Sequence, residues 1–282
     1  MDLHGAFGKV VASMFLIAVL WPGTVSAQGE RTLGWSDVAE LTFVLTAGNA
    51  SSSTFGFKNT ADYLWEKASF KLSAGAVRTE SGITTRTAAG TPADFTVTET
   101  TATELTAENY FLKSRLDRAL GESMFLYGGA DWDRNTFAGI QNRYGFVSGA
   151  GRSWFDEDTR RFKTDLGLTY TIQDDVVKDP DADDSFFGLR GSYDYFRKLT
   201  ESAGMASVLV VDQNLSTTED FRADWTNSLA VSMSERLALK TSLQVLYDKA
   251  PALTSVPLGD SQVLTPLGKV DTVFTVAIVA SF

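Results

Sequence analysis

Histidine and cysteine carry most nucleophilic and zinc chemistry in proteins, and this sequence of 282 residues has almost none of either. The one histidine, His4, lies in a segment that we expect to be removed after export, and cysteine is absent. The remaining chain therefore cannot form a Ser-His or Cys-His nucleophilic pair. We predict that the protein is not an enzyme, with no catalytic residues and no cofactor-binding residues.

Aspartate side chains are the remaining candidates for chemistry, and two of them share one predicted strand. Asp131 and Asp133 are two residues apart, so a strand would place both carboxylates on the same face. Such a pair can act as acid and base, but carboxylates that face a common interior more often belong to a network of ion pairs. A carboxylate-only enzyme is therefore the disfavoured alternative.

A second acidic run is the only candidate for a metal site. Asp179, Asp181 and Asp183 have the one-three-five spacing of an EF-hand loop. Ser185 and Arg190 follow where that loop needs a further oxygen ligand and a closing glutamate, so an EF-hand is not expected. The run is interpreted as a solvated acidic loop, with loosely bound Ca²⁺ or Mg²⁺ as the alternative.

The elements that must position these charges are strands, and the segment 270–282 shows their pattern most clearly. Alternate residues form one apolar stripe, while the opposite face is small and mixed, as in a strand with hydrocarbon on one side and a polar lumen on the other. The stripe ends at the terminal Phe282 and resembles the C-terminal strand by which bacterial outer-membrane barrels are recognised and inserted. We therefore predict an assembly signal, which consists of Phe274, Val276, Ile278, Ala280 and Phe282.

The N-terminus has the features of an export signal. Lys9 precedes an apolar core over residues 10–20, and small residues that end at Ala27 suit cleavage. We predict a cleaved signal peptide over 1–27, with an uncleaved interfacial anchor as the alternative, and a short periplasmic segment over 28–35. A pI of 4.7 and a net charge of −10 argue against nucleic acid as a partner.

Residues 36–282 contain about twelve alternating segments, joined in turn by tight turns and by longer polar loops. This alternation predicts an all-β fold: a transmembrane, antiparallel, up-and-down β-barrel of about twelve strands. The longest predicted loops cover 80–100 and 250–268, and the phase of the alternation is ambiguous over 144–155 and 205–211. A soluble β-sandwich is the alternative, although its strands are usually shorter.

The polar stripes of these strands would face the barrel interior and bring opposite charges together. The predicted lumen charge network contains Lys58, Asp62, Arg115, Asp131, Asp133, Lys163, Asp165, Arg190, Asp194, Arg222, Asp224 and Lys240. Because the signs balance and twelve strands enclose a modest interior, these long side chains could largely fill it.

Several glycine and aromatic motifs carry a resemblance to a known family. They are Leu45–Ala50, Trp132–Arg134, Phe137–Arg143, Gly149–Arg152 and Leu166–Tyr170. In this order and spacing they resemble the salt-induced outer-membrane proteins of domain-of-unknown-function family 481, across most of residues 36–282. The resemblance implies a fold and a location, and it implies no biochemical activity.

Together these features predict a barrel in the outer membrane of a Gram-negative bacterium. Its expected role is structural, or a response to salt or osmotic stress, with a narrow or closed lumen. The alternative is a small passive pore for ions or small solutes. Expected partners are outer-membrane lipid, lipopolysaccharide and the barrel-assembly machinery, and the oligomeric state is left open.

Overall fold

Twelve antiparallel strands close into a barrel in the described part of the chain, as the sequence predicts. The computed structural model describes residues 33–46, 51–91, 94–180, 182–258 and 261–282. The predicted signal peptide, 1–27, therefore lies outside the described residues. Among the described residues, no helical segment has the length and hydropathy needed to cross a membrane.

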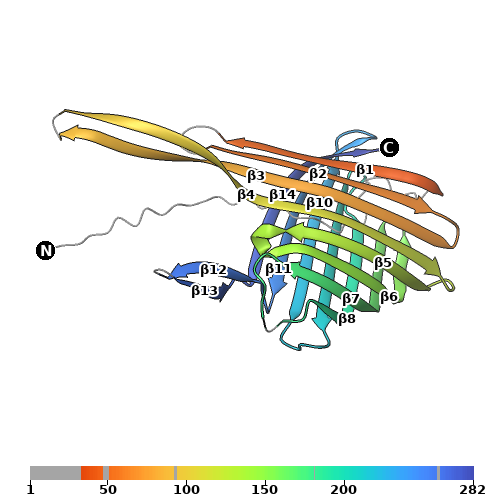
Figure 1. Ribbon diagram of the computed structural model, residues 1–282. Coiled ribbons are helices and arrows are strands. Elements are labelled where there is room, and N and C mark those ends of the chain that lie inside the picture. The colour runs from red at the N-terminus through yellow and green to blue at the C-terminus, as the bar shows by residue number, and fades with distance from the viewer. Residues whose placement is uncertain (1–32, 47–50, 92–93, 181, 259–260) are drawn as a thin grey trace.

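Each strand pairs with its neighbours in sequence, and the last strand of the barrel closes on the first (Figure 1). The barrel strands are β1 (Gly34–Thr46), β2 (Ser51–Leu64), β3 (Ala68–Thr91), β4 (Asp94–Ala119), β5 (Met124–Asn135), β6 (Ile140–Glu157), β7 (Arg160–Asp175), β8 (Ser185–Lys198), β9 (Ala203–Asn214), β10 (Phe221–Ser232), β11 (Leu237–Asp248) and β14 (Val270–Ser281). A separate hairpin pairs β12 (Leu253–Leu258) with β13 (Ser261–Pro266), and a short 3₁₀ helix, η1 (Thr136–Ala138), follows β5.

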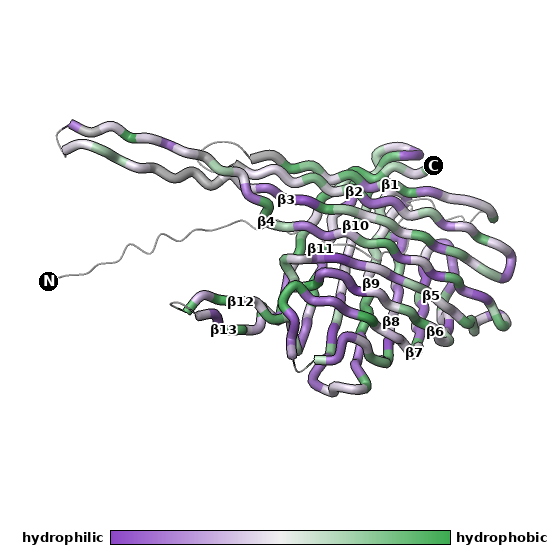
Figure 2. Tube along the Cα trace, in the orientation of Figure 1, coloured by the Kyte–Doolittle hydropathy of each residue, from purple (hydrophilic) through white to green (hydrophobic). Residues whose placement is uncertain are grey.

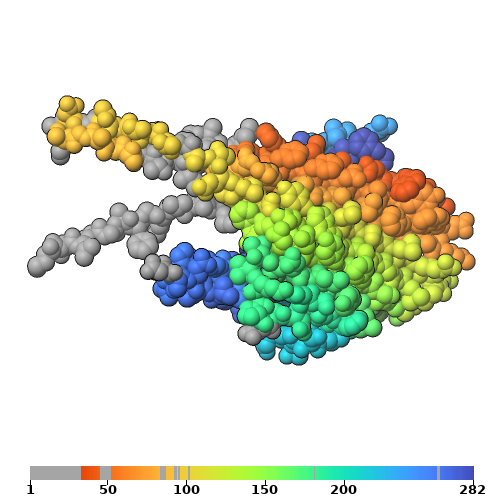
Figure 3. Space-filling view, viewed as in Figure 1, coloured from red at the N-terminus to blue at the C-terminus, as the bar shows by residue number. Residues whose placement is uncertain are grey.

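Every connection at one end of the barrel, here called the turn end, has two to four residues. At the opposite, loop end, the connections range from two residues between β3 and β4 to 21 residues between β11 and β14. This arrangement agrees with the predicted alternation of turns and loops. The predicted loop over 80–100 is wrong, however, because β3 and β4 stay paired as far as Thr91 and Asp94. They form a ribbon that projects beyond the barrel (Figures 1 and 3). Polar β-branched residues suit such a ribbon, which exposes both faces and so lacks the apolar alternation of a barrel strand.

Side chains alternate between the interior and the outer surface, as β14 illustrates. Val273 and Ala277 are buried, whereas Phe274 and Ile278 on the opposite face are more than half exposed. The predicted assembly stripe therefore lies on the outer surface, with Phe274, Val276, Ile278 and Phe282 exposed and Ala280 half-buried. Alternating hydropathy runs along the strands of the barrel (Figure 2).

The two segments of ambiguous phase each have a local cause. In β6, the register shifts between Ser153 and Phe155, and Arg152 faces outward with its guanidinium 4.5 Å from the ring of Trp154. In β9, apolar residues occupy both faces, because Val208 faces the interior while Leu209 faces outward. Apolar residues at nearly every position of 205–211 hide the period of two.

Barrel closure relies on a short seam. β1 pairs with β14 from Val38 with Ser281 to Leu41 with Ile278, and Asp37 and Phe282 exchange backbone hydrogen bonds of 3.2 and 2.9 Å. The neighbouring pair, β11 with β14, is aligned over eleven residue pairs. The β1–β14 seam therefore has fewer paired backbone residues than the neighbouring strand pair.

Candidate functional site: the barrel lumen

One cavity of about 1340 Å³ lies within the described part of the barrel. It touches Ser69, Glu201 and Arg236 at the turn end, and Phe137 and Pro251 at the loop end. At about 30 Å³ per water molecule in the liquid, this volume holds roughly 45 waters. The cavity therefore extends along the whole lumen.

Thirteen acidic and eleven basic residues of the described chain line this cavity. Ten of the twelve side chains of the predicted lumen network are among them: Asp62, Arg115, Asp131, Asp133, Lys163, Asp165, Arg190, Asp194, Arg222 and Asp224. Lys58 and Lys240 also face the interior, but they are buried away from the cavity. The network thus separates into distinct clusters.

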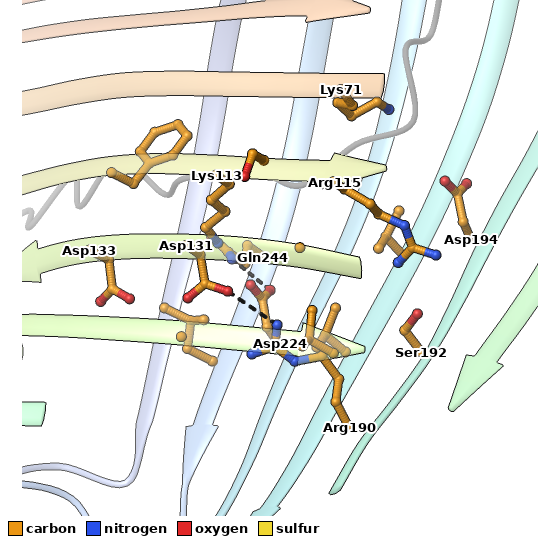
Figure 4. A pocket seen from close by; sticks show the side chains of 18 of the residues that line it. Lys71, Lys113, Arg115, Asp131, Asp133, Arg190, Ser192, Asp194, Asp224 and Gln244 are labelled. Carbon is orange, nitrogen blue, oxygen red and sulfur yellow. Dashed lines mark hydrogen bonds and ion pairs between the residues drawn. The ribbon is translucent and has the colours of Figure 1, made fainter. Parts of the chain in front are cut away.

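The middle cluster is built around Arg190 of β8. Its guanidinium donates to both carboxylate oxygens of Asp212 on β9, at 2.8 and 3.2 Å, and to Asp131 on β5 at 3.3 Å (Figure 4). Nearby, Arg143 of β6 donates two bonds of 3.0 Å to Asp133. Charge-assisted bidentate pairs of this kind hold a guanidinium in one orientation.

The cluster nearer the turn end has the same design. Arg115 of β4 donates to Asp117 at 2.6 Å and to Asp165 of β7 at 2.9 Å. Lys163 lies 3.8 Å from Asp117 and directly across the strand pair from Asp194 of β8. Asp62, another predicted member, forms a looser pair with Lys71, at 3.6 Å.

The last predicted members lie nearer the loop end. Asp224 of β10 accepts a 2.6 Å hydrogen bond from Gln244 of β11. Arg222 pairs with Asp220 at 3.3 Å, and its guanidinium lies over the ring of Phe186 at 5.3 Å. Arg222, Asp224 and Gln244 line the same cavity as the arginine clusters.

A third cluster lies in a packed region of the interior. Glu40 of β1 accepts bonds of 3.0 and 3.1 Å from Lys240 of β11, and Lys58 of β2 lies 3.5 Å away. The packed region consists of inward-facing, buried residues that do not touch the cavity: Thr54, Lys58, Thr60, Ser73, Thr79, Thr226, Ser228, Ala230, Lys240, Ser242, Val273, Thr275 and Ala277. Small polar side chains here bond to one another, as Thr60 and Ser73 do at 3.1 Å.

Glycines on β6 and β7 make room for aromatic rings that lie against the barrel wall. A Cβ atom at Gly149 would meet the ring of Tyr127 at 2.8 Å, and one at Gly167 would meet the Tyr127 hydroxyl. A Cβ atom at Gly151 would likewise meet the ring of Phe125. The glycines of the family motifs therefore let buried aromatics lie flat instead of filling the lumen.

The loop end is narrowed by packing around η1. Gly139 ends this helix with a φ of +80°, a conformation that favours glycine. A Cβ atom there would meet the side chain of Ala252, and Leu267 at 3.2 Å. Phe137, Pro251 and Leu267 line the cavity at this mouth, which is thus partly apolar.

The acidic run at the loop end forms no assembled metal site within the described residues. Asp179 and Asp183 are described, whereas Asp181 lies outside the described residues. Among the described side chains, no group of three or more acidic residues is arranged to hold a metal ion. Asp184 accepts a 2.8 Å bond from Lys178, which raises the pKa of that lysine. Cation binding at this loop stays a prediction.

Sequence reasoning missed several side chains of the site. Asp117, Arg143 and Asp212 complete the arginine clusters but were not predicted as members. Asp212 follows the ambiguous segment of β9, so the period of two gave no face for it. Asp212 lies directly opposite Arg190 in the β8–β9 pair. A correct register for these two strands would have predicted that the two side chains meet.

Comparison with solved structures finds barrels of low sequence identity. The chain is similar to the COG4313 outer membrane channel from Pseudomonas putida F1, with 11% identity, a TM-score of 0.46 and coverage of 92% of this chain and 99% of that chain. It is similar to the translocator domain of autotransporter NalP from Neisseria meningitidis, with 12% identity, a TM-score of 0.46 and coverage of 89% of each chain. It is also similar to an anion-selective porin from Comamonas acidovorans, with 10% identity, a TM-score of 0.37 and coverage of 88% and 98%.

Comparison with curated proteins gives no match. A family model described as "Protein of unknown function, DUF481" matches residues 39–282, which is most of the chain. The match confirms the family resemblance predicted from the glycine and aromatic motifs. The association of that family with salt stays a prediction for this chain.

Proposed function

The chain belongs to the DUF481 family, and from its lumen we propose that it is a passive outer-membrane channel for small hydrophilic solutes. The observation that carries this proposal is the continuity of the cavity. It touches Ser69 and Arg236 beside the turns and also Pro251 and Gly268 at the loop end. A polar interior that reaches both ends of a closed barrel is the arrangement of a pore.

The outer surface supports a membrane location. Large apolar side chains such as Phe43, Leu166, Phe187 and Phe274 are all more than half exposed on the outward faces of their strands. Burial in hydrocarbon would remove this apolar surface from water. The short connections would then face the periplasm, because outer-membrane barrels carry short turns on that side.

The charged side chains of the lumen support passage rather than catalysis. Asp131 and Asp133 share a strand face, but each is held by an arginine, Arg190 and Arg143 respectively. A carboxylate fixed in a salt bridge is poorly placed to exchange protons with a substrate. This pairing favours the role of an ion network that was predicted for the two aspartates.

An envelope-structural role with a closed lumen is the second candidate, and the packed region favours it. There inward-facing side chains such as Thr226, Ser242 and Thr275 are all less than a tenth exposed. In our proposal the packed region occupies one part of the barrel interior, and the cavity beside it stays open as the channel.

A block at one lumen residue tests the channel directly. The chain has no cysteine, so Ser192→Cys creates a single thiol on a side chain that lines the cavity (Figure 4). The variant is reconstituted into liposomes, and solute uptake is followed by liposome swelling before and after reaction with a bulky, water-soluble thiol reagent. We expect uptake of small sugars, which the reagent strongly reduces.

The matched control is Ser216→Cys, on an exposed loop away from the cavity. Labelling of this residue should leave solute uptake unchanged. Folded, inserted protein that takes up no solute before labelling would refute the channel and favour the structural role.

A further inference from the structure

Resting on the proposed channel function, we infer that the lumen passes small cations in preference to anions. Its central arginines are neutralised by two carboxylates each, and carboxylates outnumber basic side chains along the lining. The side chains that set this preference are Arg190, Asp131 and Asp212.

The positive charges of the middle lumen are bound in place. Arg190 is held between Asp131 and Asp212, and Arg115 is held between Asp117 and Asp165. Each guanidinium therefore faces two carboxylates, so each of these groups of three has a net charge of −1 before the nearby lysines, Lys163 and Lys113, are counted. A guanidinium whose donors already bond to carboxylates has little attraction left for a passing anion.

Most lining charges without an ion pair in the described chain lie at strand ends, and the one inside a strand is acidic. Asp194 lies within β8, whereas Asp248 ends β11 and Asp271 lies at the start of β14. The basic lining residues without an ion pair in this part of the chain are Lys198, Arg236 and Lys269. All three lie at the end of a strand or in a connection, next to bulk solvent that screens them.

The total charge of the lining points the same way. Carboxylates exceed basic side chains by two, since thirteen acidic and eleven basic residues line the cavity within the described chain. At water-like dielectric, one net charge several ångströms from an ion's path changes the local concentration of a monovalent ion about threefold. A lining with a small excess of acid therefore predicts a modest preference for cations and not a strict filter.

Reversal potentials in planar bilayers measure this preference. With a tenfold KCl gradient across the membrane, we expect the sign of the wild-type reversal potential to show a K⁺ permeability a few times that of Cl⁻. Raising the salt concentration on both sides should weaken the preference, because exposed charges are screened.

Two variants of the same cluster should shift the potential in opposite directions. Arg190→Gln leaves Asp131 and Asp212 unpaired and should raise the permeability ratio of K⁺ to Cl⁻ by about threefold. The double variant Asp131→Asn, Asp212→Asn leaves the guanidinium unpaired and should lower the ratio to unity or below. Glu219→Gln, at an exposed carboxylate that pairs with Lys249 outside the cavity, should change nothing.

The outcomes separate this inference from the proposed function. Folded protein that carries no current at any salt concentration would defeat the channel itself. Current with an anion-selective or unselective wild-type reversal potential would leave the channel intact and overturn the inference. The wild-type sign alone decides the inference if a variant fails to fold.

Discussion

The two parts of the barrel interior contain the same kinds of side chain but hold them differently. In the cavity region, Arg190 and Arg115 line the open space and each is bound by two carboxylates. In the packed region, the signs are reversed: Lys58 and Lys240 share the single carboxylate of Glu40, and both lysines are less than a tenth exposed.

The difference shows how burial decides what an ion cluster does. Charges that line the cavity lie beside the path of a passing ion and remain able to influence it. Charges that are buried depend on their partners, because an unpaired buried charge is strongly destabilising. We therefore interpret the cavity clusters as determinants of permeation and the Glu40 cluster as a determinant of stability.

The position of Glu40 adds to that role. The backbone of Glu40 lies opposite Val279, near the end of the short β1–β14 seam. The side chain of Glu40 reaches past β14 and accepts a hydrogen bond from Lys240 on β11. The cluster thus links β1 to β11 where backbone pairing between β1 and β14 ends. Side-chain bonds here supplement the backbone bonds that close the barrel.

Glu40→Gln should have the largest effect, because it leaves two buried ammonium groups without a carboxylate. We expect a loss of about 3–5 kcal/mol in the free energy of unfolding, or a failure to assemble. Urea titration of the refolded barrel and heat-modifiable migration on gels measure the effect.

Lys58→Met is the matched control for that change. It removes one of the two lysines and leaves Glu40 bound to Lys240 through both oxygens. We expect a change in the free energy of unfolding within about 1 kcal/mol, in either direction. Equal losses of unfolding free energy from Glu40→Gln and Lys58→Met would mean that charge balance does not explain how the Glu40 cluster stabilises the barrel.

Gly167→Ala should have an intermediate effect that appears in both stability and conductance. The new methyl group would meet the Tyr127 hydroxyl, and the carbonyl oxygen of Ser148 at 2.8 Å, and so would push the ring toward the cavity. We expect a loss of about 1–3 kcal/mol, typical of overpacking, together with a smaller single-channel current.

Gly128→Ala, on the outward face of β5, is the control for this glycine. A Cβ atom there meets only the carbonyl oxygen of Val147, at an ordinary 3.8 Å. Its current should equal that of the wild type. A Gly167→Ala variant with normal stability and current would show that the glycines do not set the position of the ring.

Lys71→Gln should have the smallest effect. The Lys71–Asp62 pair spans 3.6 Å, and both side chains are about a quarter exposed. A pair this open to water contributes less than about 1 kcal/mol, and salt screens it further. Urea midpoints of the variant and the wild type should therefore converge at high salt, and a loss comparable to that of Glu40→Gln would contradict the contrast between the two regions.

The strand pattern was predictable from the sequence where the two faces of a strand differ in polarity. β14 alternates between large apolar and small residues, so its outward face was predicted correctly. β9 is apolar on both faces, so Asp212 and its pairing with Arg190 were missed. The β3–β4 ribbon is polar on both faces and was mistaken for a loop.

The division of the interior was not predictable from alternation. A period of two tells which face a side chain occupies, but it says nothing about how far that face lies from the opposite wall. Lys58 and Lys163 have the same pattern in sequence, yet one is buried beside Glu40 and the other lines the cavity. That distinction depends on the shape of the closed barrel, which is set by contacts between distant strands.

Single-channel recording of the refolded wild-type protein in a planar bilayer tests the central claim most directly. A continuous, water-filled lumen predicts discrete, steady current steps already at low salt, with a conductance that rises in near proportion to the conductivity of the bulk solution. Folded and inserted protein that gives no current steps at any salt concentration would contradict the account and would make the cavity a closed interior.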